Sequence, residues 1–139
     1  MNDIEMIPLG KLRLAAYKRQ NRLDFALAEC DINEEGLADE LMALYLKLDV
    51  FPDVVEALGA LRQRGKRLAI LSNGSPSMLD SITRNAGLDK TFEHVLSVEE
   101  VGIYKPDRRV YQLAVDRLGI PKERICFLSS NAWDAYAAS

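Results

Sequence analysis

From residue 67 onward, short apolar segments and longer amphipathic segments alternate along the chain. Segments 67–71, 94–98 and 124–128 are short and mainly apolar, as expected of strands that are buried on both faces of a parallel sheet. Segments 75–87 and 107–119 lie between them, carry apolar residues at helical spacing and end in glycine. This order predicts βαβ units, and therefore an α/β fold with a parallel sheet whose ligands bind beyond the carboxyl ends of the strands.

The first 50 residues show helical periodicity alone. Apolar residues fall on two helical stripes, which are made of Leu12, Ala16, Leu23 and Leu27 and of Leu37, Leu41, Leu44 and Leu48. The stripes predict a helical hairpin, in which Asn33 caps the second helix. A third helix is predicted from Pro52 to Gly65. The pattern therefore divides the chain into a helical segment, residues 1–50, and a sheet-containing segment, residues 51–139.

Composition limits the classes of function. With 139 residues, of which 48% are hydrophobic and 28% are charged, the chain has the composition of one soluble globular domain. The net charge of −3 and the scattered Lys and Arg residues argue against a nucleic-acid partner. No apolar run approaches the ~20 residues that span a bilayer, so we expect no membrane partner and a cytoplasmic location. Cys30 and Cys126 are expected to be small buried side chains, and His94 has no neighbours at zinc-ligand spacing.

Two polar clusters follow predicted strands at the edge where ligands bind. Segments 71–75 (Leu-Ser-Asn-Gly-Ser) and 128–134 (Leu-Ser-Ser-Asn-Ala-Trp-Asp) offer hydroxyl and amide groups beside a helix N-terminus, which suits an anion such as a carboxylate or phosphate. Lys105 and Tyr111 lie between the clusters in the sequence. A structural interpretation stays open for each feature, because Ser, Asn, Gly and Asp also form turns and caps, and a lone lysine is usually solvated.

The three segments together resemble a known family. Segments 71–74, 103–111 and 127–134 are similar, in order and spacing, to the second, third and fourth motifs of the haloacid dehalogenase superfamily. The helices of residues 1–50 look like part of the helical cap of that family. The resemblance implies an incomplete haloacid-dehalogenase-like fold, with a partial Rossmann-like parallel sheet over residues 51–139.

The fourth motif distinguishes branches of this superfamily. Its magnesium-dependent phosphatases carry a Gly-Asp pair where this chain has Ser129-Ser130, and magnesium strongly prefers charged oxygen ligands. The string Ser-Ser-Asn-x-x-Asp, together with Tyr111, is similar to the L-2-haloacid dehalogenases in particular. That branch implies hydrolysis of a small L-2-haloacid to the D-2-hydroxy acid through an aspartyl ester, without a metal or a cofactor.

The resemblance also implies a role for each matched residue. Ser72 would hold the carboxylate of the substrate, and Asn73 would help to bind the leaving halide. Lys105 would neutralise the carboxylates of the site. Asp134 would position or activate the hydrolytic water. Three further side chains would orient the nucleophile and the substrate, namely Tyr111, Ser129 and Asn131.

One family motif is missing from the sequence. The string Asp-x-Tyr-Gly-Thr, which carries the nucleophile in the family, does not occur, and Asp3 follows no apolar strand. None of Arg13, Arg19 and Arg22 has a secure match to the arginine with which the family grips halide. We therefore expect a fragment that is inactive alone. The family's central strand would also be missing, which leaves sheet edges open to pairing and favours a homo-oligomer.

Two alternatives to a dehalogenase stay open. The first is a magnesium-dependent phosphatase of the same superfamily, and the second is a non-catalytic remnant that serves as a binding or structural protein. Dehalogenation in the absence of magnesium would distinguish a dehalogenase from the phosphatase. An activity assay of the chain beside its full-length version would distinguish a dehalogenase fragment from the non-catalytic remnant.

Overall fold

The computed structural model describes residues 23–139, and the helical stripe over Leu12 and Ala16 lies outside them. Residues 23–29 are helical and form the first arm of a hairpin with the next helix. The remaining helices and strands, in chain order, are α2 (Leu37–Tyr45), α3 (Val54–Gln63), β1 (Ala69–Ser72), α4 (Pro76–Asn85), β2 (His94–Ser97), α5 (Arg108–Leu118) and α6 (Ala132–Ala138). Two short 3-10 helices, η1 (Val98–Glu100) and η2 (Lys122–Arg124), complete the set.

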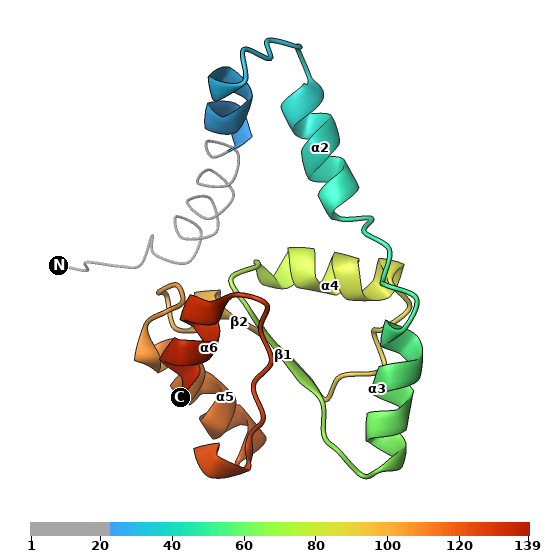
Figure 1. Cartoon of the computed structure of the whole chain (residues 1–139), viewed down its shortest axis with the longest axis vertical. Helices are drawn as coiled ribbons and strands as arrows, with labels where there is room; N and C mark the ends of the chain where they lie inside the picture. Colours follow the sequence, from blue (N-terminus) through green and yellow to red (C-terminus); the bar gives the residue numbers. More distant parts are fainter. Residues whose placement is uncertain (1–22) are drawn as a thin grey trace, which may run out of the picture.

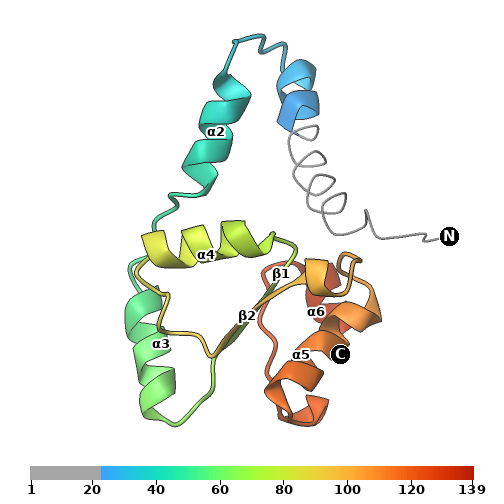
Figure 2. The same cartoon turned by 180° about the vertical axis from the view of Figure 1, so that it is seen from behind.

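The sheet of the described chain consists of β1 and β2, which run parallel. Their register pairs Ala69 with His94 and Ser72 with Ser97. The strands lie between α3 on one side and α5 with α6 on the other, and the helical hairpin stands beyond α4 (Figures 1 and 2). The α/β class with a parallel sheet is thus confirmed.

A small apolar core surrounds the sheet. Its buried hydrophobic residues are Leu79, Leu88, Leu96, Val98 and Val110. On the surface, the guanidinium of Arg67 donates twice to the carboxylate of Glu93, with both distances 2.7 Å, and once to the carbonyl of Leu118 at 2.9 Å. These bonds join the segment before β1 to the residue before β2 and to the end of α5.

The helix ends around the sheet agree with local capping rules. Ser75 precedes α4 and its hydroxyl accepts from the amide of Met78, with Pro76 at the first helical position. Asp107 precedes α5 and its carboxylate accepts from the amide of Arg109. Gly119 closes α5 in the left-handed conformation with φ 63°. Both helices therefore begin and end where the sequence predicts.

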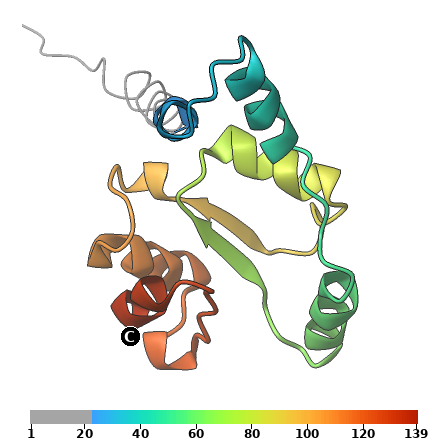
Figure 3. The same ribbon diagram turned by 45° about the horizontal axis from the view of Figure 1, so that its top comes forward.

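Segment 124–128, a predicted strand, is not one. Residues 122–124 form η2, and residues 125–129 that follow have no strand partner among the described residues. The apolar side chain of Leu128 is 83% exposed. A strand exists only through its hydrogen-bonded neighbour, and the two-stranded sheet supplies none for this segment. The ribbon in Figure 3 shows the segment apart from β1 and β2.

Two predicted helix starts also differ from the structure. Asn33 does not cap α2, which instead begins after Gly36, whose φ of 84° lies in the left-handed region. A turn at residues 35–36 takes the place of the predicted cap because glycine adopts this conformation without strain. The third helix begins at Val54, with Asp53 rather than Pro52 at its start.

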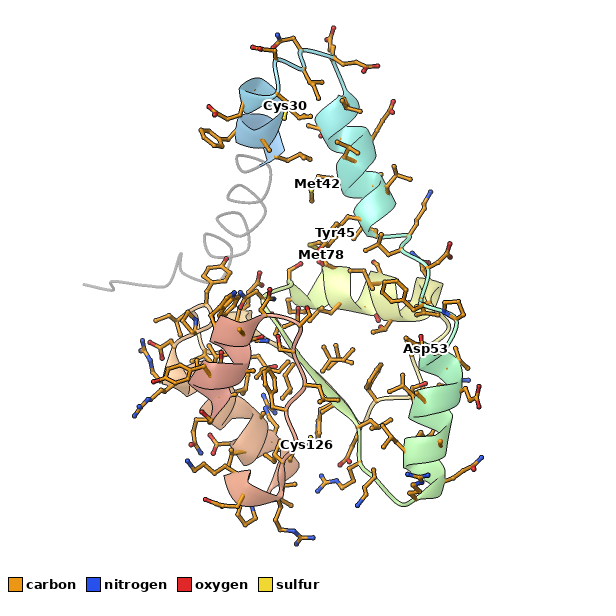
Figure 4. The ribbon with its side chains drawn as sticks, in the orientation of Figure 1. Cys30, Met42, Tyr45, Asp53, Met78 and Cys126 are labelled. Carbon is orange, nitrogen blue, oxygen red and sulfur yellow. The ribbon has the colours of Figure 1, made fainter. Side chains whose placement is uncertain are left out.

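The two cysteines are exposed, so the prediction that they are buried is wrong. Cys30 lies at the end of the first arm of the hairpin, and Cys126 lies on the extended segment after η2 (Figure 4). Cys30 lies in a turn, and Cys126 lies in a segment without a strand partner among the described residues, so no sheet encloses either side chain. No helix in the described residues is long and apolar enough to cross a membrane. The cytoplasmic location and the division at residue 51 stay predictions.

Candidate active site

A buried carboxylate organises the polar cluster at the carboxyl end of β1. Asp134, in the first turn of α6, is only 4% exposed. Its Oδ1 accepts from the hydroxyl of Tyr111 at 2.6 Å, and its Oδ2 accepts from Lys105 Nζ and from Ser129 Oγ, each at 3.0 Å. The three donors come from α5, from the loop before α5 and from the segment before α6. Three donors from three segments of the chain therefore meet on one carboxylate.

An aromatic ring supports this cluster from the apolar side. The ring of Phe127 contacts the ring of Tyr111 edge to face, with centroids 5.7 Å apart. Lys105 Nζ lies 5.1 Å from the centroid of Phe127, within the range of a cation–π contact. The side chains of Lys105 and Asp134 are only 9% and 6% exposed. Because water has little access, their ion pair and its geometry are held firmly.

Burial and hydrogen bonding set the protonation states of the cluster. Burial raises the pKa of Asp134, but the hydrogen bonds from Tyr111, Lys105 and Ser129 and the charge of Lys105 together outweigh it, so the pKa lies below its usual value. Burial, followed by the hydrogen bond to Asp134, raises the pKa of Tyr111. At neutral pH the carboxylate is therefore ionised, and Tyr111 is a neutral donor.

The turn after β1 presents hydrogen-bond donors toward the same edge. Ser72 Oγ accepts from the amide of Gly74 at 3.0 Å, which leaves its hydroxyl hydrogen available. Asn73 Oδ1 accepts from the backbone amide of Lys105 at 3.1 Å. A backbone amide can only donate, so the atom that faces it must be the side-chain oxygen of Asn73, and the two Nδ2 hydrogens remain free to donate. Both side chains therefore offer donors, which suits an anionic ligand.

A cavity of about 720 Å³ adjoins the cluster between β1, α5 and α6. Its apolar wall includes Leu71, Phe127 and Trp133, and Tyr111 reaches it from α5. Within residues 23–139 no group of three or more His, Cys, Asp or Glu side chains could hold a metal ion. The expectation of a reaction without a metal stays a prediction.

Comparison with known proteins gives the family. A family model described as "Hydrolase: haloacid dehalogenase-like hydrolase" matches residues 5–139. The chain belongs to the haloacid dehalogenase-like hydrolases. The superfamily predicted from the motifs is thus confirmed.

The relatives of this chain carry dehalogenase names. It is 52% identical over 94 residues to the (S)-2-haloacid dehalogenase of Pseudomonas sp. strain YL, covering 68% of this chain and 40% of the relative. It is 44% identical over 113 residues to (S)-2-haloacid dehalogenase 4A of Burkholderia cepacia, covering 81% and 49%. The chain spans about half the length of the curated relatives it matches.

Solved structures agree with the fold. A crystal structure of an L-2-haloacid dehalogenase matches with a TM-score of 0.82 and 40% identity, over 86% of this chain and 53% of that one. The L-2-haloacid dehalogenase of Xanthobacter autotrophicus matches with a TM-score of 0.77 and 31% identity, over 86% and 48%. The partial haloacid-dehalogenase-like fold predicted from the sequence is therefore confirmed.

The structure brings most, but not all, of the seven predicted site residues together. Four share the Asp134 cluster, namely Lys105, Tyr111, Ser129 and Asp134. Asn73 joins them through the amide of Lys105, and Ser72 lies on the same turn. Asn131 is exposed, and its backbone amide, rather than its side chain, donates to Ser129 Oγ at 3.2 Å.

Two residues of the site were not singled out in the sequence. Phe127, which supports Lys105 and Tyr111, is the first residue of the fourth motif, but it was given no role because it is one apolar residue among several in its segment. Ser97 ends β2 and is paired in register with Ser72. The rule that places ligands at strand ends could have found Ser97, because it occupies the same sheet edge as the predicted site.

Proposed function

We propose that the full-length protein hydrolyses short L-2-haloacids, such as L-2-chloropropionate, to D-2-hydroxy acids. One observation carries the proposal: the acceptor oxygens of Ser72 and Asn73 are engaged by backbone amides, so both side chains offer donors beside Lys105. A small molecule with a carboxylate and a departing halide matches such a set of donors. The dehalogenase names of the relatives support the same substrate class.

The proposed reaction has two steps. A carboxylate attacks C2 of the substrate, the bond from C2 to the halogen breaks, and the halide leaves with its electron pair. Water then adds to the carbonyl of the ester and the bond from that carbonyl carbon to the substrate oxygen breaks. One proton of the water goes to the hydroxyl of the departing 2-hydroxy acid, the other is released to solvent, and the carboxylate is regenerated. The attacking aspartate belongs to a family motif that the present sequence does not contain, so the proposal concerns the complete protein.

The cluster would contribute charge and orientation to this reaction. Lys105 offsets the negative charges of substrate and nucleophile, and Tyr111 and Ser129 fix the direction of the Asp134 carboxylate. An ionised carboxylate accepts about four hydrogen bonds, of which three are taken. Asp134 therefore has one acceptor position that none of these three donors takes. Its lowered pKa makes it a better acceptor that orients water than a strong base.

The test is halide release by the full-length protein. We expect chloride from L-2-chloropropionate in the presence of a chelator, with D-lactate as the organic product. A magnesium-dependent phosphatase would instead release phosphate from a phosphate monoester and stop when the metal is removed. Phosphate release that requires magnesium, without chloride release, would overturn the proposal in favour of that alternative.

We also propose that a second copy of this chain is a partner. The described sheet has only two strands, and segment 125–129 has no strand partner among the described residues. Open strand edges pair readily with other chains. This proposal is independent of the reaction and is tested by the size of the particle in solution.

A further inference from the structure

Ser97 is a buried hydroxyl whose hydrogen-bonding capacity is directed at the predicted substrate-binding turn. It ends β2 opposite Ser72 and is only 2% exposed. Its Oγ donates to the carbonyl of Gly74 at 2.7 Å and accepts from the amide of Glu99 at 3.1 Å. The amide of Glu99 can only donate, so the hydrogen of the hydroxyl must point to Gly74.

Gly74 is the residue through which this contact reaches the substrate-binding side chains. Its carbonyl is held by Ser97, and its amide is held by Ser72 Oγ at 3.0 Å. A Cβ added at Gly74 would lie 2.9 Å from Leu79 Cδ2 and 3.3 Å from Ser72 Oγ, so the turn is packed closely against α4. Glycine has more backbone freedom than other residues, so contacts at both its carbonyl and its amide restrict the conformation of this turn.

We propose that Ser97 is a positioning residue that sets the direction of the Ser72 hydroxyl and the Asn73 amide. The chain of contacts runs from Ser97 to the Gly74 carbonyl and from the Gly74 amide to Ser72 Oγ. The carbonyl and the amide of Gly74 belong to the two peptide planes that meet at its Cα, so holding both groups restricts the φ and ψ of Gly74 and keeps the turn that carries Ser72 and Asn73 in one conformation. As far as it concerns substrate binding, this inference rests on the proposed function.

The first arm of the test needs no activity and uses the 139-residue chain. Ser97→Ala removes the donor to Gly74, so hydrogen exchange at the amide of Gly74 should become roughly three- to tenfold faster, as expected for the loss of about one hydrogen bond. Ser97→Thr keeps the hydroxyl and should restore slow exchange. Ser81→Ala is the matched control, because Ser81 also donates to a backbone carbonyl, that of Ser77, but lies outside the site.

Ser97→Cys is a second variant for the case in which Ser97→Ala does not fold. Its side chain has a similar volume to that of serine and offers only a weak hydrogen-bond donor. We expect it to lie between the native chain and Ser97→Ala. Unchanged exchange at Gly74 in folded Ser97→Ala, or in Ser97→Cys where the Ala variant does not fold, would overturn the inference.

The second arm uses the full-length protein and separates the two proposals. Ser97→Ala should raise KM for L-2-chloropropionate roughly tenfold and change kcat less than about threefold, because Ser72 and Asn73 hold the substrate before and during the reaction. Ser97→Thr should restore KM. If the native protein releases no chloride while the exchange result stands, the proposed function fails and the positioning of the turn survives. If the full-length protein is active and Ser97→Ala leaves its KM unchanged, the proposal that Ser97 positions the substrate-binding side chains is wrong.

Discussion

At the scale of single residues, Asp134 decides the geometry of the candidate site. Its carboxylate accepts three hydrogen bonds, and each donor comes from a different part of the chain. A buried carboxylate without these donors would be costly, because burial disfavours the charged form. The donors therefore depend on Asp134 for their positions, and Asp134 depends on the donors for its charge.

Lys105 is the residue whose removal should damage the reaction most directly. In the full-length protein we expect Lys105→Ala to lower kcat for L-2-chloropropionate by about 100-fold or more, since a charge that stabilises developing negative charge is lost. Lys66→Ala is the matched control, because Lys66 is exposed in the segment before β1 and does not line the cavity. Ser130→Ala should also have little effect. Chloride release measures all three variants, and near-native turnover in Lys105→Ala would remove that residue from the mechanism.

Asp134 should make the stability of the 139-residue chain depend on pH. Its folded pKa lies below the unfolded value of about 3.9, so the ionised form stabilises the fold above that pH, and the stabilisation is lost as the pH falls through the folded pKa. We expect Asp134→Asn to lower the melting temperature at pH 7, and the difference from the native chain to shrink as the pH falls below about 3.9. Thermal melts from pH 7 downward measure the difference. Asp116→Asn is the exposed control, and a penalty that is constant with pH would contradict the prediction.

At the scale of secondary-structure elements, capping residues and glycines fix where the helices around the site begin and end. Asp107 and Gly119 bound α5, which carries Tyr111, and Ser75 begins α4 just after the substrate-binding turn. These local sequence signals therefore determine which helix or loop carries each site residue. They do not bring the elements together, because that step needs contacts between distant segments.

Two glycines should respond in opposite directions to the same substitution. Gly119→Ala should destabilise the chain by about 1 kcal/mol, because φ of 63° is strained for a residue with a Cβ. Gly59→Ala should stabilise it by about 0.5–1 kcal/mol, because Gly59 lies inside α3 with nothing within 4 Å of an added Cβ. Urea unfolding of both variants measures the two effects. Equal effects of the same sign would show that the conformation of Gly119 does not limit α5.

At the scale of the whole molecule, an incomplete sheet is the dominant feature. Only β1 and β2 pair within the described residues, and segment 125–129 stays extended without a strand partner there. Exposed apolar side chains on and after this segment include Leu128, Trp133 and Tyr136. Such a surface favours association, because apolar area and open edges are both exposed to solvent.

We expect the 139-residue chain to self-associate as its concentration rises. Light scattering should show a mean mass well above the 15.6 kDa of one chain at high concentration and a decrease on dilution. Leu128→Lys should weaken the association, because a charged side chain on an open edge opposes pairing. Lys90→Ala, on the loop before β2, serves as the control. A monodisperse monomer at all concentrations would contradict the prediction and show that the two-stranded sheet is self-sufficient.

The same chain should release no detectable chloride from L-2-chloropropionate. The sequence contains no Asp-x-Tyr-Gly-Thr motif, so the displacement has no nucleophile even where the substrate binds. A coupled assay with the full-length protein at the same molar concentration provides the comparison. Chloride release by the 139-residue chain would mean that another carboxylate, in a place not predicted here, attacks the substrate.

The sequence by itself determined the features that depend on neighbours along the chain. Ser75, Asp107 and Gly119 marked helix ends correctly, and the order of the three motifs gave the family. The extended segment before Ser129 was predicted as a strand, but a strand needs a partner that only the rest of the fold can supply. The exposure of Cys126 has the same cause.

Only the tertiary structure decided which polar groups meet. Tyr111, Lys105 and Ser129 converge on Asp134, and the hydroxyl of Ser97 reaches the carbonyl of Gly74 across the sheet. These contacts join positions up to 29 residues apart. Residue types and helical periodicity report local conformation, whereas hydrogen bonds between distant segments depend on the register and packing of the sheet. The direction in which each site residue donates was therefore visible only in three dimensions.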